Sequence, residues 1–325
     1  MIPRVSVVVP TYRRPDLLER CLTALLAQDL SPCDYEVIVS DDAVADETRR
    51  QVEAMATCMS RCGHTLRYIP VTCSRGPAAA RNAGWRAARG AIIAFTDDDC
   101  IPAPNWLSRG IAAFADGVDG VSGKLVVPVP PVPTDYERNA AQLAHAEFVT
   151  ANSFYRRSAI AAVGGFDERF LMAWREDSDL HFALLKRGAR LVRVPEAAVV
   201  HPIRSAGWGV SLRQQRKSYY NALLYKKHPH LYRKFIQAFP PWRYYAIVAA
   251  LLVAFTGASS GHLIWAWTGG LLWFAFTVRF GLYRLRGTSH APSHIAEMVV
   301  TSALIPPVSI FWRIYGALRW RVWFL

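Results

Sequence analysis

Three consecutive carboxylates, Asp97, Asp98 and Asp99, follow an apolar run at residues 91–96. The run predicts a buried strand, and side-chain alternation along a strand would place Asp97 and Asp99 on one face and Asp98 on the other. Neighbouring carboxylates repel each other unless a hard cation lies between them, and Mg²⁺ and Mn²⁺ favour such oxygen ligands together with substrate phosphates. The triplet is a candidate site for a metal-bound diphosphate, although a solvated acidic turn explains it equally well when it is taken alone.

Strand and helix signals alternate over the first 204 residues. The predicted strands are 5–9, 35–40, 66–70 and 91–96, and the predicted helices are 16–28, 46–59 and 77–89. Such alternation is typical of a mostly parallel sheet that binds its ligands at the carboxyl ends of its strands. We therefore expect Thr11, Asp41-Asp42 and the aspartate triplet at one edge of a sheet, which disfavours the solvated-turn interpretation.

A second acidic pair begins a later helix. Glu176-Asp177 opens an apolar-faced helical segment that ends at Gly188, and the turn Gly164-Gly165 precedes it. Carboxylates in the first turn of a helix also occur because of the helix dipole alone. A structural and a functional interpretation of this pair are therefore both open at this point.

The charge of the chain is unevenly distributed. The sequence has 38 Lys or Arg and 25 Asp or Glu, a formal net charge of +13. From Ser205 onward it has 14 basic residues and a single acid, Glu297, so the first 204 residues carry 24 of each and are neutral. Long apolar runs interrupt the basic tail, which argues against nucleic acid as its partner and favours a membrane surface with anionic lipids.

The C-terminal part has the composition of a membrane region. Residues 210–238 carry seven basic residues and no acid among aromatic and leucine side chains, as in a helix lying on a membrane surface. Three apolar stretches follow, at about 244–260, 262–283 and 295–312, whereas a span needs roughly 20 apolar residues. The expected parts are 1–208 as a catalytic domain, 209–240 as basic amphipathic interface helices and 241–325 as membrane-associated helices.

The number of spans depends on the third stretch, which contains Pro306-Pro307. Arginines follow both the second and the third stretch, and the positive-inside rule places both groups in the cytoplasm. This favours two spans over three, with the segment around the two prolines as a re-entrant or interfacial helix.

Five motifs, in order, resemble those of the inverting glycosyltransferases of family 2, which have the GT-A fold. They are Val7-Val-Val-Pro-Thr-Tyr-Arg13, Val37-Ile-Val-Ser-Asp-Asp42, Gly76-Pro-Ala-Ala-Ala-Arg-Asn-Ala-Gly84, Phe95-Thr-Asp-Asp-Asp99, and Gly164-Gly-Phe-Asp-Glu followed by Arg175-Glu-Asp177. The resemblance implies an α/β fold: a GT-A, Rossmann-like catalytic domain with a mostly parallel sheet, followed by an α-helical membrane region. The chain departs from the family at Asp42-Ala43-Val44, where Gly-Ser usually follows the two acids. It also lacks the QxxRW motif of processive synthases, which favours the addition of a single sugar.

The resemblance implies roles for particular residues. Asp177 would act as the general base, with Glu176 beside it. Donor contacts would come from Pro10, Thr11, Tyr12, Arg13, Asp42, Arg81, Asp97 and Asp98, with Asp42 at the base and Arg81 at the diphosphate. A Mg²⁺ or Mn²⁺ ion would be held by Asp99, Asp97 and His201. Candidates for contacts with the acceptor are Asn152, Arg156 and Trp174, the first two also with the donor sugar.

These features together predict an enzyme of a bacterial-type inner membrane with its catalytic domain in the cytoplasm. It would transfer one sugar from a nucleoside-diphosphate sugar to a membrane-embedded acceptor, a polyprenyl phosphate or a lipid-linked saccharide. The alternatives are a catalytically inactive, membrane-bound nucleotide-sugar binder, a transferase with a soluble acceptor, and a nucleotidyltransferase. The intact acids argue against the first, and the lack of glycine in Pro10-Thr-Tyr-Arg-Arg-Pro15 argues against the last.

Overall fold

The computed structural model describes residues 2–115 and 117–324. The chain forms two compact units that interleave along the sequence. The first unit comprises Met1–Pro128 and Gln142–Pro202, and the second comprises Val129–Ala141 and Ile203–Leu325. The Pro-rich segment 129–141 therefore belongs with the C-terminal helices, a connection that composition alone did not indicate.

The first unit contains an eight-stranded sheet of order β3-β2-β1-β4-β7-β6-β8-β5. Its strands are β1 Val5–Thr11, β2 Tyr35–Asp41, β3 Thr65–Pro70, β4 Ile92–Phe95, β5 Ile101–Pro102, β6 Gly120–Val126, β7 Ser153–Arg156 and β8 Leu191–Val200. The β3-β2-β1-β4 half is parallel, as the alternation of strands and helices predicts. The other half is mixed, because β7 runs antiparallel to β4 and β6, and β5 antiparallel to β8. Between β6 and β7 the chain passes through segment 129–141, which belongs to the second unit.

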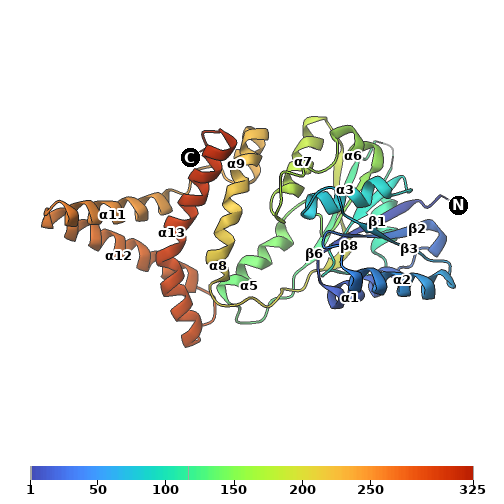
Figure 1. Ribbon diagram of the computed structural model, residues 1–325, viewed down its shortest axis with the longest axis horizontal. Coiled ribbons are helices and arrows are strands. Elements are labelled where there is room, and N and C mark those ends of the chain that lie inside the picture. The colour runs from blue at the N-terminus through green and yellow to red at the C-terminus, as the bar shows by residue number, and fades with distance from the viewer. Residues whose placement is uncertain (1, 116, 325) are drawn as a thin grey trace. The chain divides into compact units, whose positions relative to one another are not determined.

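Helices cover both faces of this sheet (Figure 1). The helices on one face are α3 Pro77–Ala87, α6 Arg157–Val163 and α7 Glu176–Lys186, and those on the other are α1 Pro15–Leu26, α2 Asp46–Ser60 and α4 Trp106–Ala112. Val5, Val7 and Val9 of β1 pack in the core beside α1, whereas Val8 packs in the core beside α3. All seven residues of β1 are buried, as expected for a strand covered on both faces.

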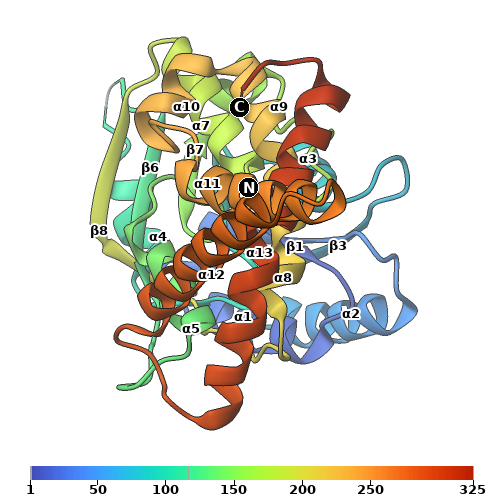
Figure 2. The same cartoon turned by 90° about the vertical axis from the view of Figure 1, so that its left-hand side faces the viewer.

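The second unit is helical. Its helices are α5 Asp135–Ala140, α8 Val210–Arg213, α9 Ser218–Lys227, α10 Pro229–Phe235, α11 Trp242–Ser259, α12 Leu263–Leu285 and α13 Pro292–Trp320. Figures 1 and 2 show α11 and α12 side by side, with α13 crossing them. The α11–α12 pair is close because Gly257 and Gly269 lack side chains: a Cβ on either would lie 2.4 Å from the backbone of the other helix.

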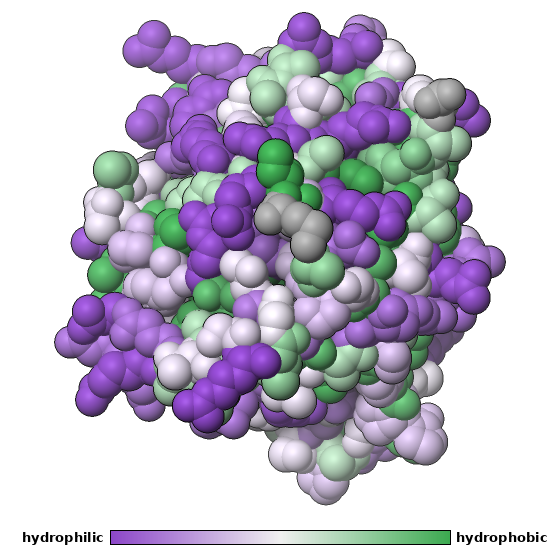
Figure 3. All heavy atoms as spheres, turned by 90° about the vertical axis from the view of Figure 1, so that its right-hand side faces the viewer, coloured by the Kyte–Doolittle hydropathy of each residue, from purple (hydrophilic) through white to green (hydrophobic). Residues whose placement is uncertain are grey.

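The second unit has the surface of a membrane-associated protein. Helices α11, α12 and α13 are each long and apolar enough to cross a membrane. They expose large apolar side chains such as Phe255, Ile264 and Trp267. By contrast, hydrophilic side chains predominate on the face of the first unit that Figure 3 shows. Helix α13 is continuous through Pro306 and Pro307, and the choice between two and three spans stays a prediction.

The basic segment after residue 209 is not one long amphipathic helix. It consists of α8, a 3₁₀ turn at Gln214–Lys217, α9 and α10. The apolar residues Tyr220, Leu223 and Leu224 of α9 are buried. Helix α13 comes so close to α9 at Gly316 that a Cβ there would lie 2.7 Å from the carbonyl oxygen of Tyr219. Much of the apolar side of this segment is therefore used in packing within the second unit.

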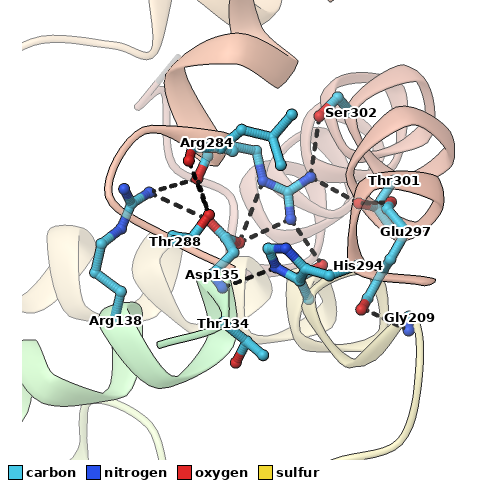
Figure 4. Close-up of polar contacts among 12 residues, drawn as sticks. Thr134, Asp135, Arg138, Gly209, Arg284, Thr288, His294, Glu297, Thr301 and Ser302 are labelled. Atoms are coloured by element: carbon cyan, nitrogen blue, oxygen red, sulfur yellow. Dashed lines mark hydrogen bonds and ion pairs between the residues drawn. The ribbon is translucent and has the colours of Figure 1, made fainter. Parts of the chain in front are cut away.

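A buried polar cluster joins segment 129–141 to the helices of the second unit (Figure 4). Arg284 of α12 donates to Asp135 Oδ2 of α5 at 2.8 Å and to Thr301 Oγ1 of α13 at 2.7 Å. The amide of Asp135 also donates to His294 Nε2 at 3.0 Å. Burying an arginine in an apolar helical unit requires such partners, so we attribute the attachment of α5 to Arg284.

Candidate active site

The loops after β1, β2 and β4 converge at the carboxyl edge of the sheet, as predicted from parallel strand order. The amide of Asp42, just after β2, donates to the carbonyl oxygen of Thr11 at 3.0 Å. The hydroxyl of Thr11, the last residue of β1, donates to Asp98 Oδ2 at 2.8 Å. Residues from three distant parts of the sequence therefore share one small region.

The three carboxylates of the triplet have three different sets of partners. Asp97 accepts a hydrogen bond from Arg81 at 2.8 Å, and Asp98 accepts one from Arg14 at 2.9 Å in addition to that from Thr11. Asp99 faces His201, whose Nε2 lies 3.7 Å from Asp99 Oδ1. Strand alternation does not orient these side chains, because β4 ends at Phe95 and the triplet lies in the turn that follows. The prediction that Asp97 and Asp99 share one face of a strand is therefore wrong.

Asp99 and His201 fit a divalent cation. A carboxylate oxygen and an imidazole nitrogen 3.7 Å apart can both bind one ion placed between them, and both residue types are common ligands of such metals. Cys100 has its sulfur within 4.8 Å of the same atoms. Burial and the nearby aspartates raise the pKa of this thiol well above its ordinary value, so without a bound ion it stays protonated.

Arg81 connects the triplet to the acidic pair of α7. Its Nη2 donates to Asp97 at 2.8 Å and its Nη1 donates to Glu176 at 2.9 Å. Burial opposes the charged guanidinium, but the two carboxylates outweigh that effect and raise the pKa of Arg81. Burial also raises the pKa of Glu176 to about 7, despite the attraction of Arg81. The Arg81 contact with a diphosphate stays a prediction, whereas its position favours a role in fixing two acids.

Asp177 is placed differently from Glu176. It is the second residue of α7 and is half-buried, whereas Glu176 is buried. One carboxylate oxygen of Asp177 accepts from the amide of Ser178 at 2.6 Å. Arg175, which precedes the helix, has φ 77°, a left-handed conformation that costs a non-glycine residue free energy and is frequent at functional sites. A partly accessible carboxylate at a helix N-terminus can take a proton from a bound hydroxyl.

Asn82, the neighbour of Arg81, holds the Gly164-Gly165 turn, a role that the sequence did not reveal. Its Oδ1 accepts from the amide of Phe166 at 2.9 Å, and its Nδ2 donates to the carbonyl of the same residue at 2.9 Å. Gly165 has φ +84°, and a Cβ there would lie 2.6 Å from Asn82 Oδ1. Asn82 therefore connects α3 to the glycine turn.

The remaining predicted donor residues lie at the same edge. Pro10 is the sixth residue of β1, Tyr12 is 48% exposed, and the Arg13 guanidinium lies 5.5 Å from the Tyr12 ring. Both carboxylate oxygens of Asp42 accept from the amide of Gly76 at 2.9 Å, which ties the β2 loop to the start of α3. Contacts of these residues with a nucleotide stay predictions. Arg14, which bonds Asp98, was missed although it adjoins the quoted motif.

The predicted acceptor residues do not gather in one place. Asn152 is fully buried, and its amide bonds Trp106 and the carbonyls of Lys124 and Ala197, so it has no exposed atom to offer a ligand. Arg156 pairs with Ile92, the first residue of β4, at the opposite edge of the sheet from the triplet. It lies there because β7 is antiparallel to β4, whereas the sequence predicted a mostly parallel sheet. Trp174 precedes α7 and packs against the Arg175 guanidinium, 4.4 Å from its ring centre.

Comparisons with known proteins agree with this architecture. The "Glycosyl transferase family 2" model matches residues 6–165, and the "Glycosyl transferase family group 2" model matches residues 92–315, more than half of the chain. The mannosyltransferase PcManGT from Pyrobaculum calidifontis, solved with GDP-Man and Mn²⁺, superimposes with a TM-score of 0.62 at 22% identity, over 96% of this chain and 88% of that one. This likeness shows that the first unit has the GT-A fold.

Two curated relatives place the sequence more closely. Glycosyltransferase AglE of Haloferax volcanii is 29% identical over 218 residues, 63% of this chain and 69% of that protein. The GalNAc(5)-diNAcBac-PP-undecaprenol beta-1,3-glucosyltransferase of Campylobacter jejuni is 35% identical over 98 residues, 30% of each. The chain thus spans about two thirds of the archaeal relative and under a third of the bacterial one. It belongs to glycosyl transferase family group 2.

Proposed function

We propose that this glycosyltransferase transfers a single sugar, with inversion, from a nucleoside-diphosphate sugar to a polyprenyl phosphate or lipid-linked saccharide at the cytoplasmic face of a membrane. The observation that carries the proposal is the Arg81 bridge between Asp97 and Glu176. It fixes the position of Asp97, in the aspartate triplet, relative to Glu176 at the start of α7. A single displacement by a hydroxyl needs both: stabilisation of the leaving diphosphate and a base for the acceptor hydroxyl.

In this mechanism the acceptor oxygen attacks the anomeric carbon while the bond from that carbon to the diphosphate oxygen breaks. When the acceptor is a lipid-linked saccharide, Asp177 takes the proton of its hydroxyl, whereas the phosphate oxygen of a polyprenyl phosphate is already ionised and attacks without losing a proton. Glu176, held by Arg81, keeps the start of α7 in place. Asp99 and His201 would hold a Mg²⁺ or Mn²⁺ ion, which neutralises charge on the departing diphosphate. Mn²⁺ and GDP-Man in the structural neighbour support a metal and a nucleotide sugar, although its low identity does not define the sugar or the base.

The membrane-bound acceptor is supported by the second unit and by one relative. Three helices of that unit could cross a membrane, which would keep the enzyme where a polyprenyl chain is confined and raise the effective concentration of the acceptor. The printed name of the Campylobacter relative specifies an undecaprenol-linked saccharide. The arginines in and just after the C-terminal parts of α12 and α13, together with the positive-inside rule, support a cytoplasmic catalytic unit.

The test is a donor screen with a matched catalytic variant. Nucleotide release from UDP-, GDP- and dTDP-sugars is measured with Mn²⁺ and with polyprenyl-phosphate, lipid-linked saccharide or soluble acceptors. We expect one donor to be used with a lipid acceptor. With a saccharide hydroxyl as the acceptor, Asp177→Asn should lower turnover about 10²–10⁴-fold with donor binding retained. Binding of a donor without turnover would instead identify an inactive nucleotide-sugar binder, and transfer to soluble acceptors alone would overturn the lipid acceptor.

A further inference from the structure

A cavity of about 490 Å³ lies between α11 and α12, at the end of the hairpin where the chain enters α11 and leaves α12. Arg243 and Ile247 line it from one turn of α11. Phe276, Arg279, Phe280 and Tyr283 line it from α12, at spacings of three and four residues that place them on one helical face, and Arg286 lines it from just after the helix. The walls of this cavity come entirely from the second unit.

The polar part of the cavity is cationic. Three arginines and no carboxylate contribute to its lining in the described part of the chain. All three are exposed, and Arg243 lies over the Tyr283 ring at 5.0 Å. Arg284, within the same stretch of α12, is by contrast 4% exposed and bonded to Asp135 in the polar cluster. Arg284 therefore stabilises the packing of the second unit, whereas Arg279 and Arg286 line the cavity.

The rest of the lining is apolar. Ile247 and Phe280 are buried in the hairpin, and Phe276 extends the apolar wall away from Arg279. Leu272, one turn before Phe276 on the same side of α12, is exposed and continues this surface along the helix. A ligand that fits has an anionic head and a hydrocarbon chain that follows the helix.

The arginine side chains specify the head group further. Planar guanidinium groups bind phosphate through paired, charge-assisted hydrogen bonds, and several of them around one cavity favour a phosphate over a single carboxylate. A free nucleotide is a poor match, because it has no long apolar chain for Phe276 and Leu272 to contact. The combination matches a phosphate-bearing lipid.

We infer that the cavity between α11 and α12 binds the phosphate of a polyprenyl-phosphate lipid, with Arg243, Arg279 and Arg286 on the phosphate and Phe276 on the first isoprene units. This inference rests on the proposed function, since it gives the lipid-linked acceptor a site in the second unit.

Basic residues nearer the first unit along the sequence are less suited to this role. Arg213 Nη1 donates to the carbonyl of Trp208 at 3.1 Å, and Lys226 Nζ donates to the carbonyl of Trp320 at 2.8 Å. The Arg216 guanidinium lies 5.7 Å from the centre of the Trp312 ring. These contacts hold the basic segment within the second unit, so we place the phosphate at the α11–α12 cavity.

The test measures lipid binding separately from sugar transfer. The full chain is placed in nanodiscs of phosphatidylcholine, and a long-chain polyprenyl phosphate is titrated by native mass spectrometry. Arg243→Gln and Arg279→Gln should each weaken binding about tenfold or more, because each removes a hydrogen bond between charged groups. Arg319→Gln is the matched control, since it removes one charge from an exposed arginine of α13 outside the cavity and should change binding less than twofold.

Competitors identify the ligand class. The unphosphorylated polyprenol, phosphatidylglycerol and inorganic phosphate should each fail to displace the polyprenyl phosphate at equal concentration. The inference is overturned if phosphatidylglycerol or inorganic phosphate competes equally with the polyprenyl phosphate. It is also overturned if Arg243→Gln and Arg279→Gln bind the polyprenyl phosphate as tightly as the control Arg319→Gln. Thermal unfolding of each variant shows whether it is folded, and nucleotide release in the absence of lipid reports the first unit independently. A variant that loses lipid binding but keeps normal nucleotide release therefore reports on the α11–α12 cavity alone. Absence of nucleotide release would instead count against the proposed function.

Discussion

Arg81 and Glu176 are 95 residues apart in the sequence, and their side chains form an ion pair of 2.9 Å in which each side chain is only 4% exposed. The same guanidinium reaches Asp97. A buried pair of this kind adds little net stability, but removing one partner leaves a buried charge without compensation. The pair therefore fixes the start of α7 relative to α3, and its loss should lower the free energy of unfolding.

Replacing Arg81 should destabilise the protein strongly. Arg81→Ala leaves two carboxylates near one another, and we expect a loss of about 3–5 kcal/mol in the free energy of unfolding. Arg86→Ala, in the same helix, breaks only a half-exposed ion pair with Glu168 and should cost under about 1 kcal/mol. Denaturant or thermal unfolding in detergent measures both. Equal costs for the two variants would show that the buried bridge has no special role.

The Mn²⁺ concentration that the enzyme requires should depend on His201. His201→Ala should raise the Mn²⁺ concentration needed for half-maximal activity at least about 10-fold, because even an outer-shell partner of a metal contributes that much. His64→Ala is the control: His64 contacts Tyr35, the first residue of β2, at the opposite edge of the sheet. Mn²⁺ titration of nucleotide release provides the measurement. An unchanged Mn²⁺ requirement in His201→Ala would remove this residue from the metal site.

The two glycines of the Gly164-Gly165 turn should differ in their tolerance of alanine. Both have positive φ, 82° and 84°, so either substitution costs about 1–2 kcal/mol of backbone strain. Only at Gly165 would the new Cβ also meet Asn82 Oδ1, at 2.6 Å, while nothing lies within 4 Å at Gly164. Gly165→Ala should therefore lower the unfolding temperature more and also reduce turnover. If the two variants were equally stable, the Asn82 contact would not be a constraint.

Acid should destabilise the first unit partly through His181. Burial against Phe148, whose ring lies 4.6 Å away, lowers the pKa of His181 from 6.5 to about 4. Between these values the unfolded chain binds the proton and the folded one does not, so stability is full above pH 6.5 and is lost as the pH falls toward 4. Between pH 7 and pH 5 the free energy of unfolding should fall by about 2 kcal/mol because of His181.

The measurement compares unfolding at pH 7 and 5 in the parent and in His181→Gln. The loss on acidification should be smaller in the variant by about that amount. His145→Gln, at an exposed position, serves as the control and should behave as the parent does. Buried carboxylates whose pKa is raised, Asp98 and Glu176, act in the opposite direction, but they are present in all three proteins and cancel in the comparison. An unchanged pH slope in His181→Gln would contradict the prediction.

The sequence predicted the parallel half of the fold because its signals are local. β1 and β2 are short apolar runs, and the rule for parallel strands then places Thr11 and Asp98 at one edge, where they bond at 2.8 Å. The antiparallel strand β7 has no such local signal. Because β7 runs antiparallel to β4, Arg156 pairs with Ile92 and lies at the opposite edge from the triplet.

Side-chain partners were less predictable than positions. The motif residues Arg81, Asn82 and Gly165 were each noticed, but motif spacing carries no information about which polar atoms meet. The Asn82 contact with Phe166 joins residues 84 positions apart, and only the packing of α3 against the glycine turn brings it about. Asn152 failed as a ligand candidate for a related reason, since a polar side chain in a motif can equally satisfy buried carbonyls.

The bond between Arg284 and Asp135 also sets the order of events during synthesis. The two residues are 149 positions apart, so the ribosome completes α5 well before its partner in α12 exists. At about 5–20 residues per second this interval is of the order of ten seconds. During that time segment 129–141 lacks its partner in α12. In a nascent chain halted between residues 202 and 284, segment 129–141 should therefore be cleaved by protease. Protection of this segment from cleavage should arise only when α12 emerges from the ribosome.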